Sequence, residues 1–123
     1  MPAQGAVSET ELAILQLLWD RGPLTARALR EVLYPEGTTS QHGTVQKLLQ
    51  RLEHKGFVER DRSEFVHRFR PTLTRSEYAG QQLESLAEKL TEGSLVPFVL
   101  HFVEGKKISS RERKAIRDLL DGK

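Results

Sequence analysis

The sequence predicts a mainly α-helical protein with a small β-hairpin, on the evidence of three patterns. Apolar residues recur at the spacing of one helix face in several segments of the chain. Three expected helices begin with a capping box, in which Ser or Thr stands three residues before Glu, at Ser8, Thr74 and Ser109. One short arginine-rich stretch after residue 56 instead alternates as strands do.

The composition limits the class of protein. The chain has 123 residues, and its hydrophobic content of 37% favours a modest core completed by a second copy. The absence of cysteine excludes disulfides and thiolate metal sites and fits a reducing compartment, so we expect a cytoplasmic location. We also expect no signal peptide, because the first eleven residues have no basic n-region or apolar h-region. We expect no membrane insertion, because the longest apolar run, residues 95–103, is too short to cross a bilayer.

Two helices are expected in the first third of the chain. The first runs from the Ser8 capping box to about Asp20, and Gly22-Pro23 breaks it. The second is short, Ala26 to Leu33, with Thr25 as its N-cap. Their inner residues are Leu12, Leu15, Leu18 and Trp19 in the first helix, and Ala28, Leu29, Val32 and Leu33 in the second.

A third helix is predicted from about Ser40 or Gln41 to Lys55-Gly56. Gly56 supplies the left-handed residue that follows many helices, and Lys55 lies favourably at the negative end of the helix dipole. One face is apolar, and the other carries amide and cationic side chains that suit base edges and phosphates. The apolar face holds Val45, Leu48, Leu49 and Leu52, and the polar face holds Gln46, Lys47, Gln50 and His54, flanked by Thr44 and Arg51.

Two strands are predicted at residues 57–60 and 65–70, around a polar turn. Alternation in the second strand places Phe65, His67 and Phe69 on one face. A short helix, a brief turn, an amphipathic helix and a basic hairpin follow one another in a winged helix-turn-helix. We therefore predict that fold for residues 1–73, with the hairpin as its wing.

Basic residues concentrate in the middle of the chain, as expected of one nucleic-acid-binding face. Residues 21–75 hold eleven Lys and Arg against six Asp and Glu, a net charge of +5, whereas residues 76–123 hold eight of each. A solvated surface with chance asymmetry is the alternative. The residues predicted to contact double-stranded DNA are His42, Thr44, Gln46, Lys47, Gln50, Arg51, Arg60, Arg62, Arg68 and Arg70.

Each group of these residues also has a structural interpretation. Lys47 and Arg51 either contact phosphates or bases or are ordinary solvated helix residues. Gln46 and Gln50 carry amides that can bind adenine through two hydrogen bonds. The wing arginines either touch phosphates or the minor groove, or form a charged edge that blocks sheet-to-sheet association, and the two roles are compatible. Gly43 either permits a close approach of the backbone to DNA or is neutral.

The last fifty residues are expected to form three short helices, from Thr74 to Gly93, from 95 to 103 and from 110 to 120. So few residues rarely make a stable core alone. Burial against an identical copy is the simplest remedy, so residues 74–123 are predicted to be a dimerisation domain; the alternative is that they pack back on the first domain. The predicted interface residues are Ala79, Leu83, Leu86, Leu90, Phe98, Phe102, Ile116 and Leu119.

Neither catalysis nor a bound metal or cofactor is indicated. The sequence has no Gly-rich phosphate loop, and its four histidines lie far apart without an H-x-x-x-H pair. The leading hypothesis is therefore a DNA-binding dimer that is not an enzyme. The alternative is a winged-helix protein-interaction module without sequence-specific DNA binding, which has no need of four wing arginines.

Four segments together resemble the penicillinase-repressor (BlaI/MecI-type) family of winged-helix transcriptional repressors. The family's recognition helix has a Thr-aliphatic pair, then Leu and Arg-Leu, which here are Thr44-Val45, Leu48 and Arg51-Leu52. The resemblance implies a homodimeric repressor on a palindromic operator. The segments are ELAILQLLWDRGPLTARAL, GTVQKLLQRLEHKGFV, HRFRPTLTRSEY and FVLHFVEGKKISSRERKAIRDLL.

The resemblance also implies how such a repressor is released. In the antibiotic-responsive members a membrane sensor that detects a β-lactam leads to proteolysis in the C-terminal domain, between Asn and Phe in a run like LNFVE. This chain has His101 and Phe102 at that place, so these residues mark the expected position of any proteolytic switch. The copper-responsive branch uses C-terminal cysteines, which this chain lacks. The inducing signal is not assigned.

Overall fold

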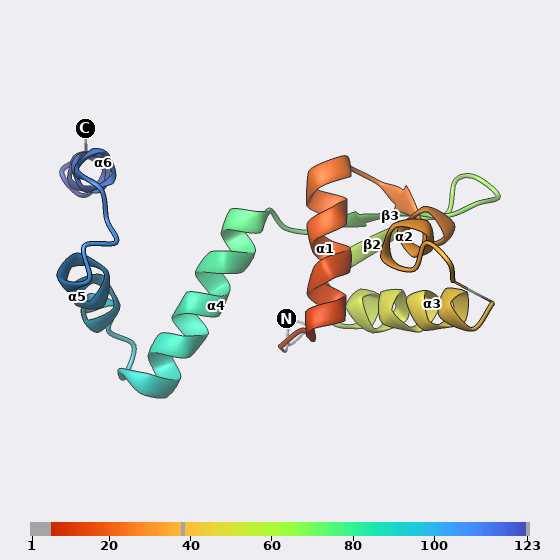
Figure 1. Cartoon of the computed structure of the whole chain (residues 1–123), viewed down its shortest axis with the longest axis horizontal. Helices are drawn as coiled ribbons and strands as arrows, with labels where there is room; N and C mark the ends of the chain where they lie inside the picture. Colours follow the sequence, from red (N-terminus) through yellow and green to blue (C-terminus); the bar gives the residue numbers. More distant parts are fainter. Residues whose placement is uncertain (1–5, 38, 123) are drawn as a thin grey trace. The chain divides into compact units, whose positions relative to one another are not determined.

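The computed structural model describes residues 6–37 and 39–122, which form six helices and a small antiparallel sheet (Figure 1). This is the mainly helical architecture with a hairpin wing that the sequence predicts. The described chain divides into two compact units after Tyr78. In chain order the elements are α1 (Glu9–Arg21), β1 (Leu24–Thr25), α2 (Ala26–Leu33), α3 (Thr39–His54), β2 (Val58–Asp61), β3 (Arg68–Pro71), α4 (Arg75–Leu90), α5 (Val96–Glu104) and α6 (Ser110–Leu120).

The three predicted capping boxes are all confirmed. The Ser8 hydroxyl accepts from the Glu11 amide at 3.1 Å, and the Glu11 carboxylate accepts from the Ser8 amide at 2.8 Å. The same reciprocal pair occurs at Thr74 with Glu77 and at Ser109 with Glu112. Each box satisfies two amides that a helix start otherwise leaves without a partner.

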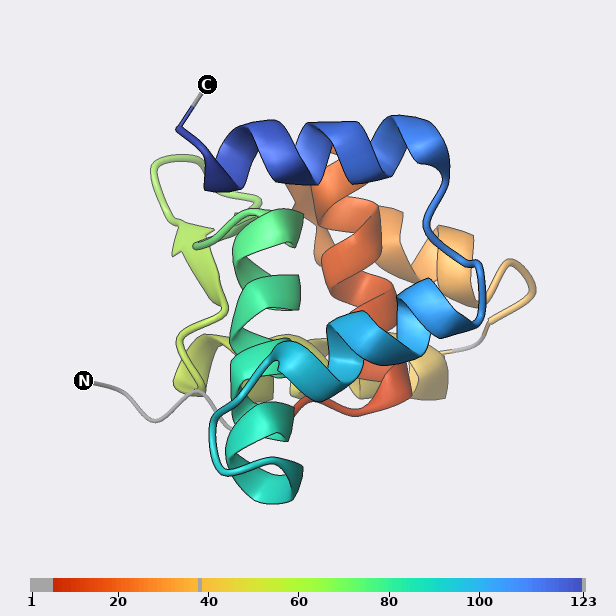
Figure 2. The same ribbon diagram turned by 90° about the vertical axis from the view of Figure 1, so that its left-hand side faces the viewer.

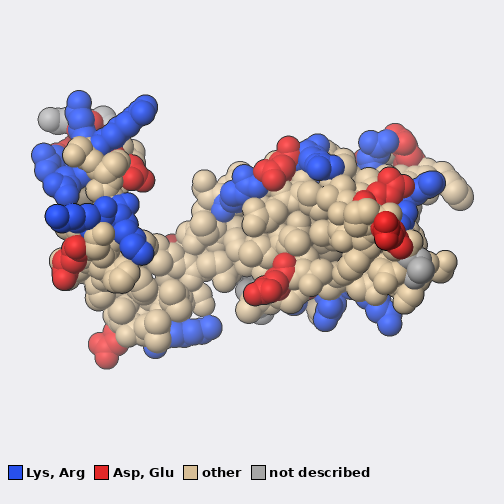
Figure 3. All heavy atoms as spheres, in the orientation of Figure 1, with Lys and Arg blue, Asp and Glu red and all other residues tan. Residues whose placement is uncertain are grey.

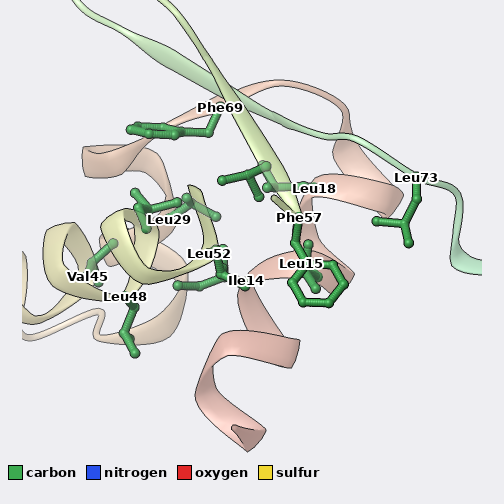
Figure 4. Packing of buried hydrophobic residues seen from close by; sticks show 12 residues of the cluster. Ile14, Leu15, Leu18, Leu29, Val45, Leu48, Leu52, Phe57, Phe69 and Leu73 are labelled. Carbon is green, nitrogen blue, oxygen red and sulfur yellow. The ribbon is translucent and has the colours of Figure 1, made fainter. Parts of the chain in front are cut away.

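The core of the first unit lies where α1, α2 and α3 meet the sheet (Figure 4). All four apolar residues predicted for the inner face of α3 are buried. Trp19 packs against this core, and its indole Nε1 donates to the Leu73 carbonyl at 2.9 Å. The core residues are Ile14, Leu15, Leu18, Leu29, Val45, Leu48, Leu49, Leu52, Phe57, Val58, Phe69 and Leu73.

The sheet differs from the prediction in two ways. Strand β1, only two residues long, was not predicted, and it pairs with β3 so that Leu24 lies opposite Phe69. Strand β3 begins at Arg68, and residues 62–67 form a loop, which we call the wing loop. The expected shared face of Phe65 and Phe69 is therefore wrong: Phe69 is 4% exposed in the core and Phe65 is fully exposed.

The second unit comprises the rest of α4 with α5 and α6, joined by short connections (Figure 2). Helix α4 ends at Leu90, and Gly93, which was predicted to close it, lies in the turn that follows, with a φ of 88° and its amide donating to the Ala87 carbonyl at 3.0 Å. Among the described residues of this unit, Ala87 alone is buried. The expected division of the chain at residues 73 and 74 stays a prediction. None of the helices in the described part of the chain is long and apolar enough to span a membrane.

Candidate nucleic-acid interface

The polar residues of helix α3 lie at the surface because its apolar face packs in the core. Val45, Leu48, Leu49 and Leu52 are at most 4% exposed. The helical period then places the side chains between them at the surface. Figure 3 shows Lys and Arg side chains along the outer edge of the first unit where α3 lies. The exposed side chains of α3 among the predicted DNA contacts are Thr44, Gln46, Lys47, Gln50 and Arg51, and His42 is half-buried.

One row of α3 residues faces the wing. His42, Gln46 and Gln50 follow one another one helical turn apart and line a groove of about 420 Å³, which we call the wing groove. The wing loop contributes residues 65–67 to the same groove. A second hollow lies beside it on the outer face of α3, lined by Lys47, Gln50, Arg51 and His54. The structure thus places the predicted α3 residues other than Thr44 around two adjoining hollows, the first of which the wing loop borders.

The C-terminal end of α3 is held to α1 by an ion pair that the sequence did not reveal. Lys55 Nζ lies 3.1 and 3.2 Å from the two carboxylate oxygens of Glu11 and 2.9 Å from the Ala6 carbonyl oxygen. Glu11 is 2% exposed. Burial raises the pKa of Glu11, but hydrogen bonds from Ser8 and Lys55 outweigh it and lower the pKa overall. The pair fixes the C-terminal end of α3 against α1.

Three of the four predicted wing arginines are already paired with carboxylates. Arg60 Nη2 lies 3.4 Å from Glu53 Oε1, and its guanidinium stacks 4.7 Å from the centre of the Phe69 ring. Arg62 approaches the other oxygen of Glu53 at 3.8 Å, and Arg70 Nη2 lies 3.1 Å from Glu59 Oε2. Arg60 therefore braces the wing against α3, whereas Arg62 and Arg70 stay largely exposed in weak surface pairs.

The remaining cations of the site are unpaired. Within residues 6–37 and 39–122, Lys47, Arg51 and Arg68 have no ion-pair partner, and all three are exposed. Thr44 instead turns its hydroxyl to the Ser40 carbonyl at 3.1 Å, which supports the first turn of α3. The strongest candidates for phosphate contact are thus the unpaired cations.

Several groove residues were missed by sequence reasoning. Strand β1 brings Thr25 opposite Arg68, which places the start of α2 against the wing. Ala26, Arg27 and the wing-loop residues line the groove for this reason. A two-residue strand has no periodicity that could have revealed the pairing. The described residues contain no group of three metal-ligating side chains.

The residues predicted for dimerisation lie in the second unit with their side chains mostly uncovered. Leu83, Leu86 and Leu90 project from α4 and are 39% to 69% exposed. Phe98 is half-buried and Ala79 is exposed. His101 and Phe102 lie inside α5, their rings 5.7 Å apart edge to face. The other predicted interface residues are also exposed: Phe102, Ile116 and Leu119.

Three helices around a small sheet, with a polar third helix beside a basic wing, define the winged helix-turn-helix class of DNA-binding proteins. A family model described as "Penicillinase repressor" matches residues 7–122, so the chain belongs to the penicillinase-repressor family of transcriptional repressors. Proteins of this family are transcription regulators and not enzymes, as expected from the sequence.

Individual members of the family are similar over nearly the whole chain. The "Transcriptional regulator BlaI" of Mycobacterium tuberculosis H37Rv is 33% identical over 93% of this chain and 82% of its own length. The "Penicillinase repressor" of Bacillus licheniformis is 24% identical over 94% of this chain and 89% of its own. The "Methicillin resistance regulatory protein MecI" of Staphylococcus aureus N315 is 23% identical over 95% of this chain and 94% of its own length.

Proposed function

We propose that this protein represses transcription as a homodimer that binds a palindromic operator, with α3 of each copy in the major groove. The single observation that carries the proposal is the wing groove, where an amide and imidazole row of α3 and the wing loop border one concave surface. Amide side chains bind base edges, and cations bind phosphates. Occupation of promoter DNA would then exclude polymerase.

The residues of α3 divide between these two tasks by their chemistry. Gln46 and Gln50 present amides that suit adenine, and His42 extends the same row. Lys47 and Arg51 supply unpaired charge for phosphates or guanine. On the wing, Arg68 has no ion-pair partner among the described residues and is available to bind phosphate. Arg62 and Arg70 would leave their weak surface ion pairs with glutamates to bind phosphate. Arg60 contributes chiefly by holding the wing in place.

A second copy is proposed to cover the apolar faces of the second unit. Twelve of the fifteen exposed large hydrophobic residues in the described chain belong to α4, α5, α6 and the connection before α5. Large exposed apolar areas mark interaction sites, and repressors of this class pair two half-sites. Dimerisation would set the recognition helices about 34–36 Å apart, one turn of DNA, or a multiple of it.

Release from the operator is proposed to involve the second unit. The bond between His101 and Phe102 lies within α5, so a protease must first open this helix locally. Cutting there would separate α6 from the rest of the unit and weaken the dimer. Since one half-site binds weakly, the operator would be freed. A membrane sensor-protease system is the proposed partner for this step.

The proposal is tested by selecting duplexes from a randomised library with the intact protein and measuring affinity across a salt series. Lys47→Ala and Arg51→Ala should weaken binding to the selected duplex and reduce the slope of log K against log salt by about 0.9 per lost phosphate contact. Sedimentation should show an unchanged dimer. Lys114→Ala removes an exposed lysine of α6 and serves as the matched control, with no effect expected.

The same experiment distinguishes the alternative function. A protein-interaction module would enrich no sequence, and its weak binding to DNA would not respond to Gln46→Ala or Gln50→Ala. Loss of folding in Lys47→Ala, measured by thermal unfolding, would instead show that Lys47 is structural.

A further inference from the structure

The tip of the wing carries two apolar side chains that the fold leaves exposed. Phe65 is 100% exposed and Val66 is 55% exposed. The two phenylalanines near the strands, Phe57 and Phe69, are by contrast 0% and 4% exposed in the core. Burying an apolar side chain is favourable relative to leaving it in water. An apolar pair held in water at a loop tip suggests a partner that covers it.

The loop presents this pair in a defined way. The Asp61 carboxylate accepts from the Ser63 amide at 2.9 Å, which shapes the turn just before the tip. On the far side Arg68 begins β3, which is paired with both β1 and β2. A loop constrained at both ends loses little conformational freedom on binding.

The position of the tip identifies the partner as DNA. Phe65 and Val66 line the wing groove together with Gln46 and Gln50 of α3, so the tip borders the surface that is proposed to face the operator. Arg62, the first residue of the wing loop, and Arg68, which follows the loop, lie on either side of the tip in sequence, and both are exposed. Cations beside an apolar wedge are the side chains with which proteins enter and bend the minor groove.

We propose that Phe65, supported by Val66, is a wedge that enters the minor groove next to each half-site and makes operator affinity depend on how easily that DNA deforms. This inference rests on the proposed function. The contact is apolar in character, because the side chains of Phe65 and Val66 carry no polar atom. Flexible pyrimidine–purine steps below the tip are the preferred sequence, since they open at least cost.

The test uses a duplex selected by the intact wild-type protein. Phe65→Ala should bind that duplex about tenfold or more weakly, on the scale of a lost aromatic stacking contact, with the salt slope unchanged. The bend measured by circular permutation of the site should decrease. Phe65→Trp should keep most of the affinity and the bend. Arg68→Ala should reduce the salt slope, which separates loss of charge from loss of the wedge.

A second duplex makes the test specific to deformability. Replacing the flexible step under the wing with a stiff A-tract should weaken the wild-type protein and leave Phe65→Ala unaffected. Thermal unfolding of Phe65→Ala should match the wild type, because the side chain makes no core contact.

The outcomes that overturn the inference are distinct. Wild-type affinity and bend in Phe65→Ala would show that the tip does not enter DNA, while the selected operator would still support the proposed function. Loss only of cooperative binding to adjacent sites would assign the tip to protein contacts instead. Failure of the wild type to select any sequence would overturn the proposed function and this inference together.

Discussion

The ion pair between Glu11 and Lys55 shows how a single residue can serve two purposes. Lys55 was expected at the end of α3 for its favourable interaction with the helix dipole. The structure adds a partner 44 residues away, in the first turn of α1. Glu11 is at once a capping residue and a buried anion. Removing the lysine would leave that anion without its cation, which costs more than the intact pair contributes.

Lys55→Met should therefore lower the free energy of unfolding by about 2 kcal/mol at pH 7, less than for a fully buried pair because Lys55 is partly exposed. Urea titration monitored by circular dichroism measures the change. Lys47→Met, on the same helix but unpaired, is the control and should change stability little.

The pH dependence follows from the lowered pKa of Glu11, for which burial is outweighed by the hydrogen bonds from Ser8 and Lys55. A carboxyl whose pKa is lower in the folded state stabilises the protein above its unfolded pKa, about 4.3, and loses that contribution as pH falls through the folded pKa. The wild type and Lys55→Met should therefore converge in stability as the pH is lowered below about 4. A constant difference down to pH 3 would contradict the assignment.

At the scale of elements, substitutions at two glycines within helices can distinguish an effect on stability from an effect on DNA binding. A Cβ added at Gly43 in α3 or at Gly80 in α4 would meet no atom within 4 Å. Alanine in place of glycine favours a helix by about 1 kcal/mol. Gly43, however, lies one turn before Lys47 on the proposed DNA face.

Gly43→Ala and Gly80→Ala should both raise the thermal midpoint by a few degrees, through the same gain in helix propensity. Only Gly43→Ala should also weaken binding to a selected operator, because the added methyl group separates the α3 backbone from DNA. Equal affinities for the two variants would show that Gly43 is neutral, the alternative that its sequence position leaves open. Calorimetry and fluorescence anisotropy provide the two readouts.

The hairpin shows why the boundaries of the strands were predicted less accurately than those of the helices. The helices begin and end close to the predicted residues, because hydrogen bonds between near neighbours determine caps and C-termini. The alternation in residues 65–70 predicted a strand that begins at Phe65, whereas residues 65–67 belong to the wing loop in the structure. Strand length depends on which residues find a partner across the sheet, and β2 offers partners for Arg68 to Pro71 only.

At the scale of the whole molecule, the second unit lacks a core of its own. Its one buried residue among those described, Ala87, cannot offset the entropy of ordering three helices. The uncovered stripe of α4, which includes Leu83, Leu86 and Leu90, is therefore central to the proposed dimer.

Leu86→Asp should convert the protein to monomers in sedimentation, because two unpaired carboxylates would be buried in each interface. Ser85→Asp adds the same charge to the same helix, away from the stripe, and should leave the dimer intact. A dimer that survives Leu86→Asp would overturn the assignment of this stripe to the dimer interface. Leu86→Asp should also lower operator affinity, because a monomer binds only one half-site.

The sequence by itself determined the order of the helices and their capping boxes, and through the family's motifs it identified a member of the penicillinase-repressor family. These features arise between residues a few positions apart, where hydrogen bonding and helical period leave local patterns. Only the tertiary structure decided the β1 pairing, the Glu11–Lys55 ion pair, the carboxylates that hold the wing arginines and the exposure of Phe65. Each depends on contacts or packing between segments distant in sequence, for which the chain carries no periodic signal.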